Sequence, residues 1–211
     1  MRYLLLIILF LLSSCNVNNF KECISLNESV IVIDPGHGGK DNGASNDVLI
    51  EDELNLEISF LISNYLINKG AMVYFTRTGD YDLSDPGVSN KKKDDLKERL
   101  NIINTFNPDV FISIHMNEYP SKLVNGAQAF YYKDNKLALS IQKELNTINT
   151  KEKDVKKGDI YLLRNSLVPS CLVECGFVSG DKDYMNFQSK EYKELIAKNI
   201  ALGVEKYLEK N

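Results

Sequence analysis

The sequence predicts a single α/β domain, with helices flanking both faces of a twisted, largely parallel or mixed β-sheet. Short apolar runs alternate with amphipathic segments, several of these runs stop at glycine or proline, and no internal repeat occurs. With 211 residues, 44% of them hydrophobic and 26% charged, the chain can bury a sizeable core. The net charge of −4, without a basic stripe, gives no reason to expect nucleic acid as a partner.

The first expected strand lies in "SVIVID", which Pro35 and Gly36 end. Residues 53–69 then carry apolar side chains at helical spacing, and Gly70 is typical of the position just past a helix. The run "AMVYFTR" predicts the second strand, and residues 78–90 predict a loop. These elements form the first strand–helix–strand unit of the expected sheet.

A second helix should follow the loop, because Leu96, Leu100 and Ile103 share one helical face. The three lysines at 91–93 precede two aspartates, which favours a solvated helix start. Pro108 precedes "VFISIH", another buried strand.

The C-terminal half continues the alternation. We expect a strand in "GAQAFYY", a short helix over 135–146, a polar stretch over 147–158, a strand in "SCLVECGF" and a helix over 190–208. Parallel sheets gather ligands and catalytic groups at the carboxyl edge of their strands, so residues at the strand ends are the first candidates for a site.

The N-terminal segment predicts export. "MRYLLLIILFLLSSC" places Arg2 before an apolar run that is too short to cross a bilayer but is typical of a signal-peptide core. Its end resembles a bacterial lipobox, so we expect a signal peptide over 1–14, lipidation at Cys15 and an Asn-rich tether over 15–28. A lipoprotein would sit on the outer face of the cytoplasmic membrane. The alternative is an ordinary export signal with a chance cysteine.

Three more cysteines follow, and they do not form a disulfide framework. Cys171 and Cys175 would lie roughly 13 Å apart along an extended strand, which is too far for a bond between them. A single bridge that includes Cys23 stays open.

Both histidines of the chain follow directly after apolar runs. His37 lies in a Pro-Gly-His-Gly-Gly turn, and His115 closes "VFISIH". Glu51 precedes the first helix, and Glu174 interrupts an otherwise apolar strand. We therefore expect these four residues to meet at the carboxyl edge of the sheet.

Glu174 is unusual because a carboxylate in a buried strand is costly unless it is paired, hydrogen-bonded or bound to metal. Strand alternation places it on the opposite face from the two cysteines of the same strand, which argues against a mixed Cys/Glu metal site. The structural alternative is a salt bridge with Arg77 or Arg99.

Taken together, two imidazoles and one carboxylate form a common catalytic zinc triad that leaves one position for water. Zinc lowers the pKa of that water to about 7. A second carboxylate can then act as general base and general acid. Other nearby residues could orient these groups or serve only as turn and cap residues: Asp34, Asp41, Glu53 and Asn117.

At these residues the chain resembles the zinc-dependent N-acetylmuramoyl-L-alanine amidases of the Amidase_3 family. The matching segments, in the order of the family, are "IVIDPGHGGKDNGA", "IEDELNL", "FTRTGDYDL", "FISIHMN", "GAQAFYY" and "CLVECGF". The resemblance implies a catalytic domain over 29–211, zinc ligands at His37, Glu51 (rather than Glu53) and His115, and Glu174 as the catalytic carboxylate. It implies hydrolysis of the amide between N-acetylmuramic acid and L-alanine, with a glycan strand and its stem peptides as substrate.

The loop "DYDLSDPGVSNKKKDDLKERL" is most similar to the germination-specific cortex amidases, the CwlD group. This resemblance implies a role in spore-cortex maturation through muramic-δ-lactam formation, with the forespore membrane as the alternative membrane for the lipid anchor and an activating protein as partner. Two residues depart from the family pattern: Met116 stands where the family commonly has Ala or Leu, and Gly180 stands where it usually has Asn. Alternatives are an inactive peptidoglycan-binding lipoprotein, a vegetative amidase acting in cell separation, and another zinc hydrolase such as a carboxypeptidase or deacetylase.

Overall fold

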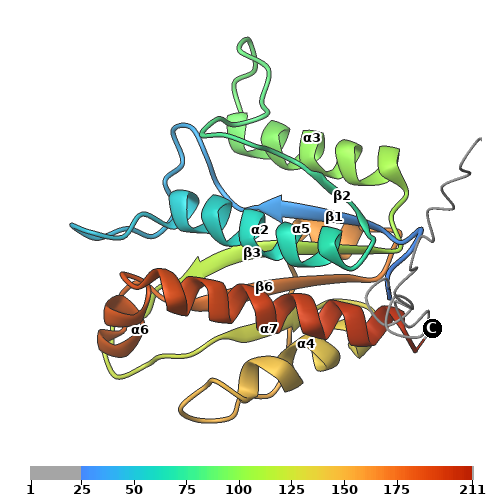
Figure 1. The fold of residues 1–211 in the computed structure, drawn as a ribbon. Coiled ribbons are helices and arrows are strands. Elements are labelled where there is room, and N and C mark those ends of the chain that lie inside the picture. Colours follow the sequence, from blue (N-terminus) through green and yellow to red (C-terminus); the bar gives the residue numbers. More distant parts are fainter. Residues whose placement is uncertain (1–24, 211) are drawn as a thin grey trace, which may run out of the picture.

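One mixed six-stranded sheet forms the centre of the computed structural model, which describes residues 25–210 (Figure 1). Its strands are β1 (Val30–Pro35), β2 (Met72–Phe75), β3 (Val110–Asn117), β4 (Gln128–Tyr131), β5 (Lys156–Lys157) and β6 (Ser170–Phe177). They are ordered β2-β1-β3-β6-β4-β5, with β2, β1, β3 and β6 mutually parallel and β4 antiparallel to β6.

Helices cover both faces of the sheet, which confirms the expected fold class. The helices are α2 (Glu51–Asn68), α3 (Lys91–Phe106), α4 (Lys136–Asn146), α5 (Tyr161–Asn165), α6 (Asp181–Asn186) and α7 (Lys190–Leu208). The larger core packs α2, α4 and α7 against one face, where Ile58, Ile141 and Ile200 are fully buried. The smaller core packs α3 and α5 against the other face, around Phe111 and Ile103.

The topology places the candidate residues at one edge. The chain leaves β1, reaches β2 on one side through α2, and returns through α3 to β3 on the other side of β1. A crevice forms at such a switch point, beyond the carboxyl ends of the strands. Here it lies between β1 and β3, the strands that carry the two histidines.

Several element ends follow from local chemistry. Gly70 adopts a positive φ of 95° directly after the cap of α2, as expected. The helix begins at Glu51, two residues earlier than its apolar spacing indicated, since its first turn buries the polar residues Glu51 and Asp52, which a pattern of apolar side chains does not reveal. Asn90 caps α3 by accepting a hydrogen bond from the backbone N–H of Lys93.

The expected signal peptide, Cys15 and Cys23 lie outside the described residues. Residues 25–28, at the end of the expected tether, pack against the domain: Leu26 is buried, and its N–H donates to the Lys69 carbonyl at 2.9 Å. Ser25 donates to the Glu205 carboxylate. Across 25–210, none of the helices combines the length and the apolar character needed to cross a bilayer.

Cys171 and Cys175 are both free and fully buried in the larger core, on the opposite face of β6 from the smaller core. Burial raises the pKa of the Cys171 thiol to about 12 and that of Cys175 well above its usual value. Both thiols therefore serve packing rather than chemistry.

Candidate active site

The turn after β1 is held in an uncommon conformation. His37 has a φ of 62°, and Gly38 and Gly39 follow at 124° and 66°. A non-glycine residue in the left-handed backbone conformation is uncommon and often marks a functional position. Backbone hydrogen bonds between Gly38 and Asp41 fold the segment back, which brings Asp41 Oδ1 to 3.1 Å from His37 Nδ1.

Two buried arginines hold this turn in place by donating hydrogen bonds to its backbone carbonyls. Arg77 donates to the carbonyls of Pro35 and Gly36, each at 2.9 Å. Arg99 donates to the carbonyls of Pro35 at 2.7 Å and His37 at 2.6 Å. Neither guanidinium pairs with Glu174, so the structural alternative for that carboxylate is wrong. Sequence reasoning missed this role, because Arg77 was placed at the end of the expected second strand, whereas β2 ends at Phe75.

Asp34 anchors the same network. Its carboxylate accepts hydrogen bonds from Arg99 at 2.8 Å, from Thr76 at 2.6 Å and from Ser113 at 2.7 Å. Burial alone would raise the pKa of Asp34, but the Arg99 charge and these hydrogen bonds outweigh it and lower the pKa below its usual value. Asp34 was expected to support a neighbouring site residue. It contacts Arg99, which holds the turn, and does not contact a histidine ring.

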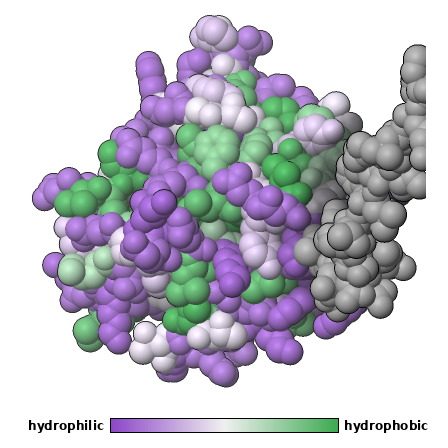
Figure 2. Space-filling view, in the orientation of Figure 1, coloured by the Kyte–Doolittle hydropathy of each residue, from purple (hydrophilic) through white to green (hydrophobic). Residues whose placement is uncertain are grey.

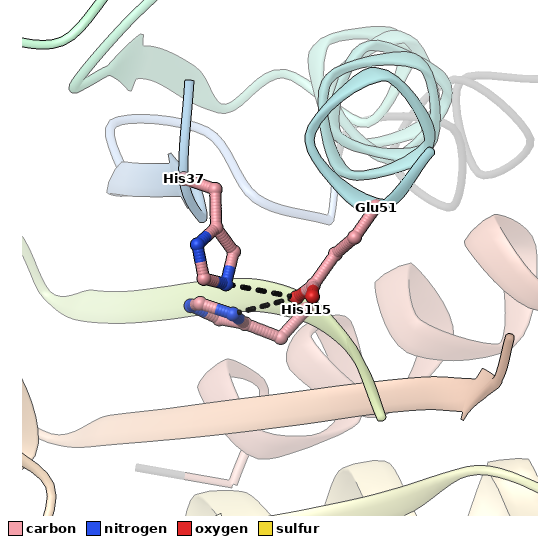
Figure 3. A group of neighbouring side chains, drawn as sticks. All are labelled: His37, Glu51 and His115. Carbon is pink, nitrogen blue, oxygen red and sulfur yellow. Dashed lines mark hydrogen bonds and ion pairs between the residues drawn. The ribbon is translucent and has the colours of Figure 1, made fainter. Parts of the chain in front are cut away.

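The two imidazoles converge on one carboxylate oxygen (Figure 3). His37 Nε2 and His115 Nδ1 each lie 3.1 Å from Glu51 Oε1. One candidate ligand atom from each of the three residues lies within 4.8 Å of the others. The three side chains come from the turn after β1, the start of α2 and the end of β3, which the sequence placed at the same edge.

The Glu51 carboxylate is further held by backbone donors. The N–H of Ala44 donates to Oε2 at 2.6 Å and the N–H of Met116 to Oε1 at 3.1 Å. Burial would raise the pKa of Glu51, but hydrogen bonds from His115 and His37 and their charge lower it far below its usual value. Burial likewise opposes protonation of His37, yet Glu51 and Asp41 raise the pKa of His37.

Two glycines leave the space that these side chains occupy. A Cβ at Gly36 would come within 2.2 Å of the His115 ring, and one at Gly43 within 2.4 Å of Glu51 Oε2. Ligands about 2.0–2.1 Å from a tetrahedral zinc ion would be roughly 3.3 Å apart, close to the 3.1 Å separations found here. The donor set, its spacing and the cleared space therefore fit a zinc ion.

Glu174 lies directly opposite His115 in the register of β3 and β6. Its Oε2 atom is buried and has no hydrogen-bond partner among the described residues. Burial, reinforced by the charge of Glu51, raises the pKa of Glu174, and the two histidines offset this only in part. Its carboxylate stands outside the three-residue ligand group, next to it on the neighbouring strand.

Of the other residues that the sequence suggested as supporting groups, one contacts the site and two do not. Asp41 contacts His37, as expected. Glu53 is exposed on α2 and lines a different hollow, and the Asn117 side chain accepts a hydrogen bond from the N–H of Glu118 rather than contacting a candidate ligand. Sequence reasoning missed Asn55, which is fully buried and donates to the Gly36 carbonyl at 3.2 Å and to Glu51 Oε1 at 3.4 Å. Its position one helical turn after Glu51 was the available signal.

Comparison with known proteins decides the family. A family model described as N-acetylmuramoyl-L-alanine amidase matches residues 31–206, which contain every residue of the site. The chain belongs to the N-acetylmuramoyl-L-alanine amidase family. The resemblance seen in the sequence motifs is thereby confirmed, and the protein is an enzyme of this activity.

Similar proteins match this amidase over nearly its whole length. The germination-specific N-acetylmuramoyl-L-alanine amidase of Bacillus subtilis is 36% identical, over 97% of this chain and 91% of the relative. The CwlD amidase of Clostridioides difficile, solved in complex with the GerS lipoprotein, aligns with a TM-score of 0.83 at 36% identity, over 87% of this chain and 100% of that one. The amidase AmiC2 of Nostoc punctiforme aligns with a TM-score of 0.75 at 32% identity, over 85% of this chain and 97% of that one.

The two departures from common family residues do not disturb the ligands of this amidase. The Met116 side chain is buried in the larger core, and only its N–H contacts Glu51. Gly180 is required by its own surroundings, because a Cβ there would come within 2.5 Å of the Val124 carbonyl and the Asn125 side chain.

Proposed function

We propose that this amidase hydrolyses the bond between N-acetylmuramic acid and L-alanine with a zinc ion held by His37, Glu51 and His115. The observation that carries the proposal is the convergence of two imidazole nitrogens on Glu51 Oε1, at 3.1 Å each. The zinc ion, when bound, supplies positive charge that polarises the scissile carbonyl and makes a nearby water more acidic.

The surrounding residues keep the ligands in place. Asp41 accepts from His37 Nδ1, so the other ring nitrogen of His37 faces Glu51. The N–H groups of Ala44 and Met116 orient the Glu51 carboxylate, and Arg77 and Arg99 fix the carbonyls of the turn. Ligands held this rigidly lose little freedom on binding.

We assign proton transfer to Glu174. Its unpartnered Oε2 and raised pKa suit a group that takes a proton from the attacking water and delivers it to the alanine nitrogen. A carboxylate with a permanent salt bridge would be a poorer proton carrier, because the bridge would hold it ionised.

We further propose that the substrate is spore-cortex peptidoglycan, where cleavage would precede muramic-δ-lactam formation. The support is the germination-specific relative of B. subtilis and the similarity to the C. difficile CwlD amidase. The latter was solved with a lipoprotein, and this supports a protein partner for the present chain as well. We also propose export, with cleavage after residue 14 and a lipid anchor at Cys15.

Digestion of purified peptidoglycan followed by mass spectrometry tests the reaction. We expect released peptides with a free L-alanine amine and glycan with an intact lactyl carboxylate. Release of acetate or of D-alanine instead would identify another zinc hydrolase, and no release would favour the inactive binding protein. For the cortex role, spores lacking the protein should lose muramic-δ-lactam; full retention would contradict that role.

A further inference from the structure

A groove extends from the candidate zinc site in two directions. A hollow of about 350 Å³ lies against His37 on the side of Lys40, Lys91 and Lys92. A second hollow of about 210 Å³ lies between the two histidines and the start of α5. The two hollows adjoin beside His37, because they share four lining residues: His37, Asp41, Lys92 and Asp95. We call them the two arms of one groove, with His115 in the second arm.

The aspartates of the first arm are already engaged. Asp82 accepts from the N–H and hydroxyl of Ser84, and Asp95 accepts from the N–H of Leu83 at 2.9 Å and from Arg99 at 2.8 Å. Asp41 accepts from the N–H of Gly43 and from His37. Their hydrogen-bonding capacity is therefore largely used within the protein, although in formal charge the three aspartates balance the three lysines of the arm.

The lysines of this arm differ from one another. Lys91 donates to the carbonyls of Asp85 and Pro86, which closes the 78–90 loop. Lys40 is exposed and forms no hydrogen bond or ion pair with the described residues. Lys92 is 75% exposed and has only a 3.6 Å ion pair with Asp41. At the top of the face in Figure 2, where Figure 1 places the 78–90 loop, hydrophilic residues stand beside residues of intermediate hydropathy. Lys40 and Lys92 are thus the two exposed ammonium groups of this arm that are held least firmly: Lys92 by one long ion pair with Asp41, and Lys40 only by its proximity to the charge of Asp82.

The second arm has an apolar side, in addition to the charged residues that it shares with the first arm: Asp41, Lys92 and Asp95. Ile160, Tyr161 and Leu162 line it together with Leu172 of β6. These side chains suit methyl groups and sugar-ring faces rather than charged groups. The two arms therefore differ in the chemistry that they can bind.

We propose that Lys40 and Lys92 bind a stem-peptide carboxylate, so that the stem peptide occupies the lysine arm and the muramoyl unit the Ile160–Leu162 arm. This inference rests on the proposed function. The glycan of N-acetylated sugars is uncharged, whereas a stem peptide that begins with L-Ala–γ-D-Glu carries a free α-carboxylate on its second residue. Of the two substrate parts, only the peptide matches two exposed ammonium groups.

The distances permit this arrangement. The Asp41 carboxylate lies between His37 and Lys92. Its Oδ1 atom is 3.1 Å from His37 Nδ1, and its Oδ2 atom is 3.6 Å from Lys92 Nζ. One extended residue spans about 3.3–3.6 Å. Two extended residues span about 7 Å, which is comparable to the path from the His37 ring through Asp41 to Lys92, so a carboxylate on the second residue of the peptide would lie near Lys92 with the scissile amide at the site.

The test compares two disaccharide-peptide substrates, one with the free α-carboxylate and one with that group amidated. Wild type should have a lower KM for the free carboxylate. The double variant Lys40→Gln/Lys92→Gln should raise this KM roughly five- to tenfold, as for loss of exposed ion pairs, with kcat and the amidated substrate unaffected. Lys93→Gln, on the neighbouring exposed lysine outside the groove, is the matched control and should behave as wild type.

Equal kinetics of the double variant and wild type on both substrates would overturn the inference, as would an equal loss on both or the same loss in Lys93→Gln. If wild type cleaves neither substrate, the proposed function fails and this inference falls with it. If wild type cleaves both without a preference, only the inference fails.

Discussion

Glu174 is the residue whose position is hardest to explain by stability. A buried carboxylate oxygen without a partner is unfavourable, so its retention in an otherwise apolar strand indicates a role in the reaction. Replacing it by Gln keeps the shape but removes the proton acceptor. We expect Glu174→Gln to lower kcat by about 10²–10⁴, with zinc content unchanged, as measured by peptide release and metal analysis.

The matched control for this change is Glu53→Gln, which alters an exposed glutamate of α2 outside the site and should retain wild-type kcat. A Glu174→Gln protein with near wild-type kcat would show that another group carries the proton.

At the residue scale, His37, His115 and Glu174 were visible as patterns in the sequence, namely rare histidines at strand ends and a carboxylate in an apolar strand, whereas the choice of Glu51 over Glu53 came from the family resemblance. The sequence did not predict the roles of Asn55, Arg77 and Arg99. Those roles depend on carbonyl groups of the turn after β1, whose direction is set by the positive φ of His37 and the following glycines.

The turn between β1 and α2 is the element on which the site depends most. A Cβ at Gly36 would lie 2.2 Å from Cε1 and 2.3 Å from Nε2 of His115, so Gly36→Ala must displace that ring. We expect a loss of about a hundredfold in kcat/KM, the effect of a displacement of roughly 1 Å, together with weaker zinc retention. Kinetics and metal analysis of the purified variant measure both effects.

Gly87→Ala provides the control, because a Cβ at Gly87 meets no atom within 4 Å. It should match wild type in activity and zinc content. Wild-type kinetics in Gly36→Ala would mean that the His115 position is not critical.

Among the elements, the long amphipathic helices were the most predictable: α7 spans Lys190–Leu208, the bounds that its apolar spacing indicated. The strand expected over 71–77 is shorter, because only Met72–Phe75 pair with β1, while Arg77 turns toward the site. The five-residue helix α5 was not predicted, since so short a segment shows too few helical repeats to be distinguished from a strand.

At the scale of the whole molecule, the buried pair of Asp34 and Arg99 joins β1 to α3. The pKa of Asp34 is lower in the folded chain than its ordinary value of 3.8. Such a group stabilises the fold above its unfolded pKa, and this contribution is lost as the pH falls through the folded value. Asp34→Asn cannot titrate, so the stability difference from wild type should shrink as the pH falls below about 4.

Urea unfolding of both proteins between pH 7 and pH 3 measures this difference. A constant difference across the range would contradict the assigned contribution of Asp34.

The α/β architecture was predictable because alternating strands and helices leave few arrangements. The strand order and the antiparallel β4 were not, since they depend on contacts between residues far apart in the chain. Nor could the sequence show the groove, which combines the 78–90 loop, the start of α3 and α5.

The central claim is that His37, Glu51 and His115 hold the zinc ion that this amidase needs. Metal analysis of purified, active protein tests it most directly, with His115→Ala as the comparison. We predict about one zinc ion per wild-type chain, and loss of both zinc and peptide release in His115→Ala. Wild-type protein that releases peptides at full rate without zinc would contradict the claim.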